Sequence, residues 1–180
     1  FKHFIAYGLK LTESKTADLQ AFDIGNLLHK VAEVFLRPQN NFCLRDKAEI
    51  PQIVEGIFDD IKKEANFAKV FLAKNKFSLQ ILRAEALRLC TYLFETYHKS
   101  NFKPKFLEVY FGANQTFNLR VLDKDFSLVG IVDRVDTYQN NAVVIDYKTG
   151  SSIAGNESEL FYGEKLQIFV YAKAIASLQN

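Results

Sequence analysis

The sequence has no methionine and no tryptophan, and only two cysteines and three prolines among its 180 residues. Cys43 and Cys90 lie far apart and fit no CxxC or Cys/His spacing, which argues against a disulfide scaffold and favours a reducing, cytoplasmic setting. No apolar run approaches the roughly 20 residues that a membrane-spanning helix needs. No signal-peptide pattern is present either, so we expect no contact with a membrane.

The lack of methionine even at position 1 indicates a fragment of a longer protein. The chain carries 23 basic and 21 acidic residues, a balance that permits nucleic-acid binding without arguing for it. A hydrophobic content of 48% with 17 Phe and 8 Tyr indicates a packed core. We expect residues 1–180 to form one domain, with 1–104 mainly helical and 105–180 holding a sheet core and a C-terminal helix.

Apolar periodicity predicts which parts of the chain are helix and which are strand. A period near 3.6 predicts helices at residues 17–36, 50–64 and 78–98, the last with Ser78 as its N-cap. After Pro104 the period changes to two, which predicts strands at 105–111, 116–122, 126–137 and 142–148, before a final helix at about 160–177. Gly112–Asn114 and Asp123–Asp125 are expected as turns. This order predicts an α+β or α/β fold.

Two acids and a lysine in the last two predicted strands carry the chemistry. Asp146 follows three β-branched residues, where an uncompensated carboxylate is costly. With Asn140 and Asn141 as hairpin turn residues, Asp133 faces Lys148 across the ladder. Side chains alternate between faces, so Asp133, Asp146 and Lys148 are expected on one face, with the two carboxylates as diagonal neighbours.

This trio suits metal-assisted hydrolysis of phosphodiesters. Hard carboxylate oxygens suit Mg²⁺, which polarises a phosphate and supplies an activated water. Lys148 would orient the attacking water and offset developing negative charge. The plain alternative is a structural ion-pair cluster, which explains most arbitrary patterns of this kind.

The segments GIVDRVD, at residues 130–136, and VVIDYKTG, at 143–150, resemble the PD-(D/E)XK nuclease superfamily in its RecB/AddB branch. GNLLH at 25–29 resembles the upstream histidine motif of that family, and QIFVY at 167–171 resembles its QxxxY signature. The four motifs occur in the family's order and cover nearly the whole chain. The resemblance implies a restriction-endonuclease-like core, with a central mixed sheet flanked by helices and a helical N-terminal half.

The resemblance also implies roles for individual residues. Asp133, Asp146 and Lys148 are implied to be catalytic. The implied metal ligands are His29, Asp133, Asp146 and the carbonyl of Tyr147. Gln167 and Tyr171 are implied to contact nucleic acid, and Glu108 is implied as an auxiliary acid. From the residues alone, His29 could be an ordinary helix residue, Gln167 and Tyr171 a packing pair, and Glu108 an edge-strand charge. Arg134 and Asp136, on the opposite face from Asp133, are expected to form ion pairs.

The function implied is a Mg²⁺- or Mn²⁺-dependent deoxyribonuclease of exonuclease type. It would belong to a helicase–nuclease complex for double-strand-break repair and recombination, with a helicase–nuclease partner subunit. A helicase motor in the parent protein would feed it a single strand from a duplex end. One alternative is a stand-alone RecB-like exonuclease, against which the opening FKHFIAYGLKL and the missing methionine count. Another is a catalytically silent DNA-end-binding module, against which the intact Asp133, Asp146 and Lys148 count.

An iron–sulfur cluster held by four cysteines is common in the AddB type. Cys43 and Cys90 do not match its ligand positions. We therefore expect no such cluster in this fragment, while the parent protein can have one.

Overall fold

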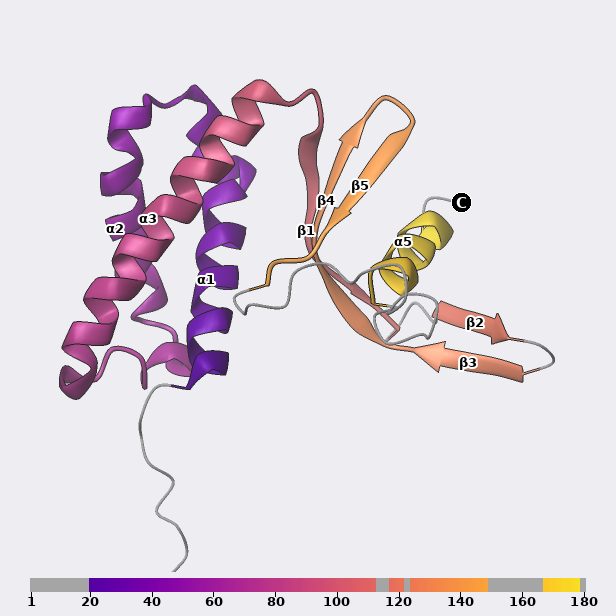
Figure 1. The fold of residues 1–180 in the computed structure, drawn as a ribbon, viewed down its shortest axis with the longest axis horizontal. Coiled ribbons are helices and arrows are strands. Elements are labelled where there is room, and N and C mark those ends of the chain that lie inside the picture. The colour runs from indigo at the N-terminus through magenta and orange to yellow at the C-terminus, as the bar shows by residue number, and fades with distance from the viewer. Residues whose placement is uncertain (1–19, 113–116, 122–123, 149–166, 179–180) are drawn as a thin grey trace, which may run out of the picture.

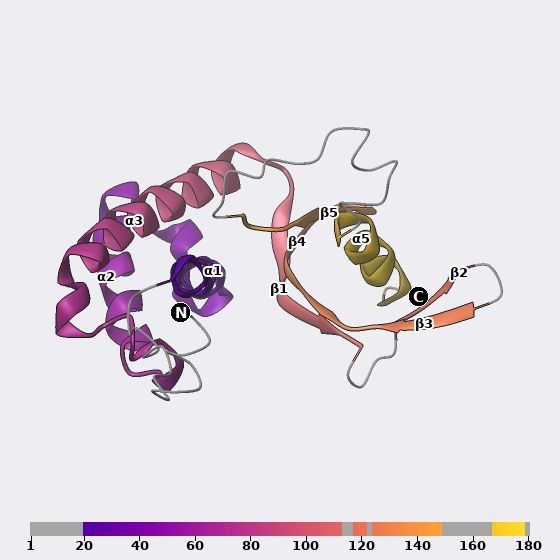
Figure 2. The same ribbon diagram turned by 60° about the horizontal axis from the view of Figure 1, so that its bottom comes forward.

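A computed structural model describes residues 20–112, 117–121, 124–148 and 167–178. Three long helices lie on one side of a curved antiparallel sheet, and a further helix lies on its other, concave side (Figures 1 and 2). This mixture of sheet and flanking helices confirms the predicted α/β class. Within the described ranges every helix is too short or too polar to cross a bilayer.

The helical half holds the three predicted helices, α1 (Ala21–Leu36), α2 (Ile50–Ile61) and α3 (Lys76–Lys99). Short 3₁₀ turns connect them: η2 (Pro38–Asn40), η3 (Phe42–Leu44), η4 (Lys47–Glu49), η5 (Ala65–Phe67) and η6 (Ala73–Asn75). The prediction that Ser78 is the N-cap was wrong, because α3 begins at Lys76 and its N-cap is Asn75. Asn75 is buried and donates to the carbonyl of Lys69 at 2.8 Å, which fixes the chain just before the helix.

The three helices share one hydrophobic core. Its fully buried members include Leu27, Val31, Phe35, Ile50, Phe58, Ile61, Ala86 and Cys90. Burial of such apolar side chains is the main favourable term in folding. Phe22 is one of the apolar residues that give residues 17–36 their helical period, but it lies outside the core and is 73% exposed.

The sheet has the strand order β1-β4-β5, with β1 (Lys103–Phe111), β4 (Gly130–Tyr138) and β5 (Asn141–Ile145) all antiparallel. A separate hairpin pairs β2 (Phe117–Val121) with β3 (Lys124–Leu128). Helix α5 (Gln167–Leu178) packs against the sheet through the core formed by Phe111, Val132, Val135, Ala174 and Ile175. The parts of the predicted last helix before Gln167, and of the predicted first helix before residue 20, lie outside the described residues.

Two predictions about β3 and β4 were wrong. The single strand expected at 126–137 is two strands separated by Val129, and Lys124 and Asp125, expected in a turn, belong to β3. The break coincides with close packing at the start of β4. The ring of Phe111 lies on Gly130, where an added Cβ would come within 2.6 Å of it. The chain there changes its pairing partner from β2 to β1.

The β4–β5 turn is one residue earlier than predicted. Tyr138 pairs with Asn141, so Gln139 and Asn140 form the turn, and Gln139 takes the positive φ of 52°. Moving the turn by one residue shifts the pairing by two, so each side chain keeps its face. The last pair is Arg134 with Ile145, which puts Asp146 at the position opposite Asp133 instead of on the diagonal. Strand β5 ends there, and the expectation that it reaches residue 148 was wrong.

Arg134 and Asp136 form the expected ion pair, and they form it with each other. The Nε of Arg134 donates to Asp136 Oδ1 at 2.6 Å, and both side chains are only 6% exposed. Arg134 Nη1 also donates to the hydroxyl of Tyr147 at 3.2 Å. A buried charge that loses its partner is strongly destabilising, so the pair makes β4 dependent on Asp136.

We expect Asp136→Ala to lower the free energy of unfolding by about 3–5 kcal/mol, because it leaves the Arg134 guanidinium buried without its counter-charge. Urea denaturation followed by circular dichroism measures this loss. The control is Asp60→Ala, which removes a surface ion pair with Lys63 and is expected to leave the midpoint unchanged. Equal midpoints for the two variants would contradict the prediction.

Candidate active site

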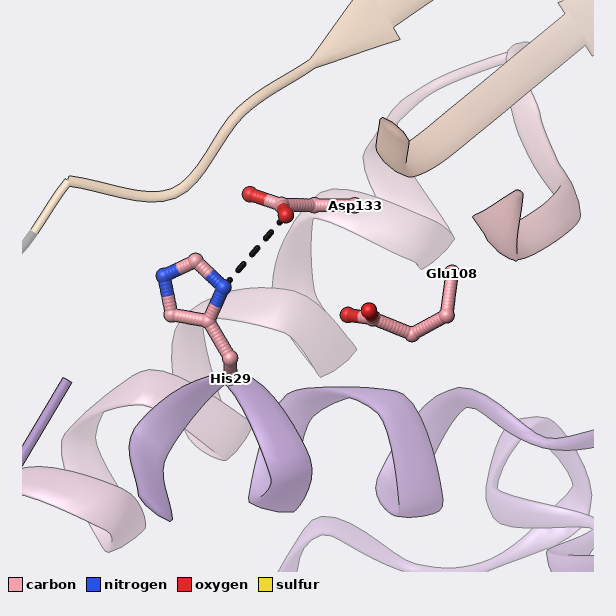
Figure 3. A group of neighbouring side chains, drawn as sticks. All are labelled: His29, Glu108 and Asp133. Carbon is pink, nitrogen blue, oxygen red and sulfur yellow. Dashed lines mark ion pairs between the residues drawn. The ribbon is translucent and has the colours of Figure 1, made fainter. Parts of the chain in front are cut away.

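Three side chains from distant parts of the chain converge between α1 and the sheet. They are His29 from α1, Glu108 from β1 and Asp133 from β4, and one ligand atom of each lies within 4.8 Å of the others (Figure 3). None of the three is fully exposed, so water screens their charges only in part. One imidazole and two carboxylates in this arrangement form a donor set suited to a divalent cation.

Glu108 reaches this cluster through an irregular backbone. Its φ of 49° lies in the left-handed region, which a residue with a Cβ adopts only at a cost. In a regular strand Leu107 and Val109 would face the same side. Here Leu107 packs on the helical core and Val109 packs on the core around α5. The conformation of Glu108 therefore turns the strand so that its carboxylate points at His29 and Asp133.

The carboxylates of Glu108 and Asp133 lie opposite each other on adjacent strands. The neighbouring pairs Leu107–Arg134 and Val109–Val132 define this register. Like charges directly opposite in a sheet repel. Burial and then the negative charge of Asp133 raise the pKa of Glu108 above its ordinary value. Among the described residues, Glu108 accepts no hydrogen bond and forms no ion pair, so its carboxylate is open to a cation.

His29 lies between two acceptors. Its Nδ1 is 3.4 Å from Asp133 Oδ1, and its Nε2 is 2.9 Å from the carbonyl oxygen of Tyr147. Both neighbours can only accept, so an imidazolium with two N–H donors satisfies both. The contact with Asp133 outweighs burial and raises the pKa of His29 above its ordinary value. The positive ring thus balances part of the negative charge in the cluster.

Tyr147 joins the cluster to the sheet with four of its groups. Its backbone N–H donates to Asp133 Oδ2 at 2.6 Å, and its carbonyl faces His29. Its hydroxyl accepts from Arg134, and its ring packs edge-on against the imidazole. These contacts arise because the chain leaves the β4–β5 ladder after Ile145, which frees the next peptide groups to turn toward Asp133.

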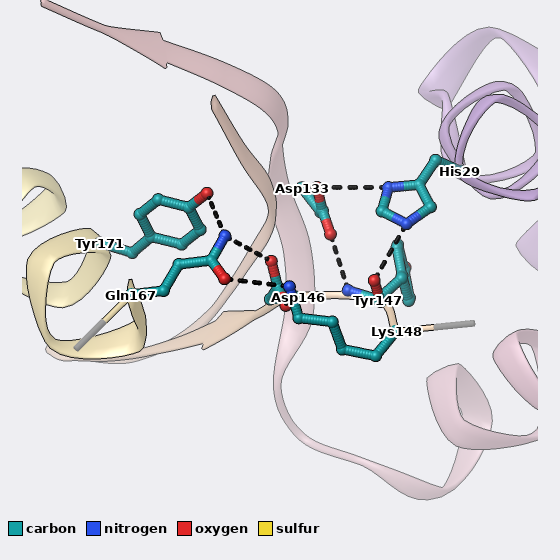
Figure 4. Close-up of polar contacts among 7 residues, drawn as sticks. All are labelled: His29, Asp133, Asp146, Tyr147, Lys148, Gln167 and Tyr171. Atoms are coloured by element: carbon teal, nitrogen blue, oxygen red, sulfur yellow. Dashed lines mark hydrogen bonds and ion pairs between the residues drawn. The ribbon is translucent and has the colours of Figure 1, made fainter. Parts of the chain in front are cut away.

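A second network continues from Tyr147 toward α5 (Figure 4). Lys148 Nζ forms an ion pair with Asp146 Oδ2 at 2.6 Å and donates to Gln167 Oε1 at 3.0 Å. Gln167 Nε2 lies 3.3 Å from Asp146 Oδ1 and 2.6 Å from the hydroxyl of Tyr171. Gln167 and Tyr171 are one turn apart on α5, so this helix holds the Asp146–Lys148 pair from the other side of the sheet.

All the residues singled out from sequence lie in these two linked networks, grouped somewhat differently than expected. His29 and Asp133 share a cluster with Glu108, and the Tyr147 carbonyl is beside them. The Asp146 carboxylate is outside that cluster and is paired with Lys148. The place of Glu108 follows from a positive φ and a strand register, neither of which has a clear sequence signal. The partly buried pairing of Arg134 with Tyr147 was also not foreseen.

Comparison of the sequence with known families assigns it to a nuclease class. The profile of the PD-(D/E)XK nuclease superfamily matches residues 1–180, the whole chain. The chain belongs to this superfamily, as its motifs predicted.

The curated relatives share a narrower name. It is similar to proteins that are named as one subunit of an ATP-dependent helicase/deoxyribonuclease. The relative from Alkaliphilus oremlandii is 29% identical over 194 residues, which cover 100% of this chain and 17% of the relative. The relative from Lachnoclostridium phytofermentans is 32% identical over 191 residues, covering 100% and 16%. The one from Clostridioides difficile is 30% identical over 188 residues, covering 97% and 16%. The chain thus spans about a sixth of the length of these relatives.

The geometry around His29 predicts its titration in metal-free protein. We expect a pKa above the ordinary histidine value in wild type and a lower one in Asp133→Asn, measured from ring resonances by NMR and assigned with His29→Gln. Because the folded pKa is raised, the pairing stabilises the fold at acidic pH, and this contribution is lost as pH rises through the raised pKa. An unchanged pKa in Asp133→Asn would show that the ion pair does not form in solution.

Proposed function

We propose that this chain is the nuclease domain of a helicase–deoxyribonuclease subunit and hydrolyses DNA phosphodiester bonds with Mg²⁺ or Mn²⁺. The observation that carries the proposal is the pair of linked networks. Tyr147 connects the cluster of His29, Glu108 and Asp133 to the ion pair of Asp146 and Lys148. The superfamily supports the nuclease activity. The names of the relatives support DNA as substrate and a role beside a helicase. We extend the proposal to double-strand-break repair and recombination.

The side chains at the cluster fit a divalent cation. Glu108 and Asp133 supply hard oxygen donors. A cation bound between them would account for two acids that face each other on adjacent strands. His29 supplies a nitrogen donor once the cation displaces one of its ring protons, and the Tyr147 carbonyl lies beside it. A bound cation would supply Lewis acidity toward the phosphate and a nucleophilic water at neutral pH. Mg²⁺ prefers oxygen donors and retains waters, so this partly open set suits it and Mn²⁺.

Lys148 acts on the reacting phosphate in this proposal, and Asp146 positions it. Lys148 is 54% exposed, so its ammonium can reach a substrate while Asp146 and Gln167 hold it in place. A fixed positive charge stabilises the negative charge that grows on phosphoryl oxygens in the transition state. Lys148 also orients the attacking water. Gln167 and Tyr171 position this pair from α5 and border the path of the bound strand.

The rest of the proposal concerns the longer protein. Relatives of about six times this length carry the names of helicase subunits, which supports a motor that feeds a single strand from a duplex end to this domain. A partner subunit, exonuclease action and a cytoplasmic location belong to the same proposal. Residues 1–180 would act in it as one domain.

The direct test is cleavage of end-labelled single- and double-stranded DNA by the chain with Mg²⁺ or Mn²⁺. We expect Lys148→Ala to lower the rate by about 10²–10³-fold, since it removes a preorganised charge from the transition state. Binding of the same DNA, measured by fluorescence anisotropy in Ca²⁺, should remain within twofold of wild type.

Lys124→Ala, which changes an exposed lysine of β3, is the matched control and should cleave at the wild-type rate. Cleavage that persists in EDTA, or in Lys148→Ala at the wild-type rate, would contradict the proposal. So would a wild type that binds DNA but leaves every substrate intact, which is the behaviour of a silent end-binding module.

A further inference from the structure

A second surface with recognition chemistry lies at the β4–β5 hairpin, away from the catalytic networks. A depression of ≈ 540 Å³ opens between the hairpin and the start of β1. Its lining includes Lys105, Phe106, Gln139, Asn140 and Asn141. No acidic residue lines it, in contrast to the carboxylate-rich cluster beside α1.

Three kinds of group meet in this depression. The ring of Phe106 is 38% exposed, although an aromatic side chain in a strand would ordinarily be buried. The Lys105 ammonium lies 5.2 Å from the centre of that ring. In the described part of the chain, the side-chain amides of Asn140 and Asn141 form no hydrogen bond, so both their donors and acceptors are free. The catalytic networks use none of these groups.

We propose that this depression binds one nucleotide of a single-stranded DNA substrate, at a point remote from the cleaved bond. Phe106 provides a stacking face that accepts any base, and Lys105 provides a charge for the adjoining phosphate. The amides of Asn140 and Asn141 hydrogen-bond the base edge that an unpaired strand leaves open. A duplex buries its base faces and its Watson–Crick edges, so the surface favours single strands. This inference rests on the proposed nuclease function for the identity of the ligand.

The depression is placed so that it can bind the same DNA strand that enters the catalytic site. Thr137, another lining residue, is four residues from Asp133 along β4, which is about 13 Å. A phosphate backbone is repelled by the acids around Asp133 and attracted by Lys105. Holding the strand at the hairpin therefore offsets poor affinity at the acidic centre and sets how far the strand reaches into it.

The experiment measures binding of a labelled oligothymidylate to the full 180-residue chain by fluorescence anisotropy, with Ca²⁺ present. We expect Phe106→Ala to raise the Kd by about 5- to 100-fold, the range for losing one stacked base. Phe106→Tyr keeps an aromatic face and should restore the wild-type Kd. Lys105→Ala should reduce the slope of log K against log salt by about 0.7, the value for one lost phosphate contact on a single strand.

Tyr92→Ala is the control, because Tyr92 is 65% exposed on α3, away from the hairpin, and its loss should leave the Kd unchanged. The proposal is overturned if Phe106→Ala binds like wild type, if Phe106→Tyr is as weak as Phe106→Ala, or if wild type does not bind the oligonucleotide.

Cleavage separates this inference from the nuclease function. In a chain that cleaves DNA, Phe106→Ala should lower kcat/KM for the oligonucleotide and leave it unchanged for a dinucleotide too short to reach the hairpin. Binding that depends on Phe106 in a chain without nuclease activity would support the hairpin site and refute the nuclease. Equal losses on both substrates would refute the hairpin site, because the effect would then arise at the catalytic centre.

Discussion

The negative charge lined up across three strands is the constraint on which the site depends. Asp133 on β4 lies between two other acids in the pairing register. Glu108 is opposite it on β1, and Asp146 is opposite it just beyond the end of β5. Three carboxylates in this register repel one another, and partial burial weakens the screening by water. Cationic groups must therefore lie beside them. His29 approaches Asp133 from α1, and Lys148 approaches Asp146 from the end of the last strand.

Two departures from regular strand geometry make this arrangement accessible to a ligand. Positive φ at Glu108 turns its carboxylate out of the ladder, and the end of β5 at Ile145 releases the peptide of Tyr147 to bind Asp133 and His29. Strain and unpaired backbone of this kind are retained where the surrounding packing holds them in place. Here the helical core on one face and α5 on the other do so. The buried Arg134–Asp136 pair anchors β4 between them.

Much of this could be read from sequence because the controlling signals are local. The helical period of α1 and the alternation in β4 and β5 depend on near neighbours, and even a misplaced turn at Asn140 left Asp133 and Asp146 on one face. What could not be read depends on distant contacts. The break at Val129 coincides with packing of Phe111 on Gly130, and the place of Glu108 follows from its opposition to Asp133. The motifs of the superfamily indicated the family because four of them occur in order.

Titration of Mn²⁺ into the chain by calorimetry tests the central claim most directly, since the structure groups Glu108, rather than Asp146, with His29 and Asp133. We expect wild type to bind Mn²⁺ and both Asp133→Asn and Glu108→Gln to lose at least about tenfold in affinity, with Glu55→Gln unchanged. If Glu108→Gln binds Mn²⁺ as well as wild type does, or if wild type does not bind Mn²⁺, the row of carboxylates is a structural ion cluster and the account is wrong.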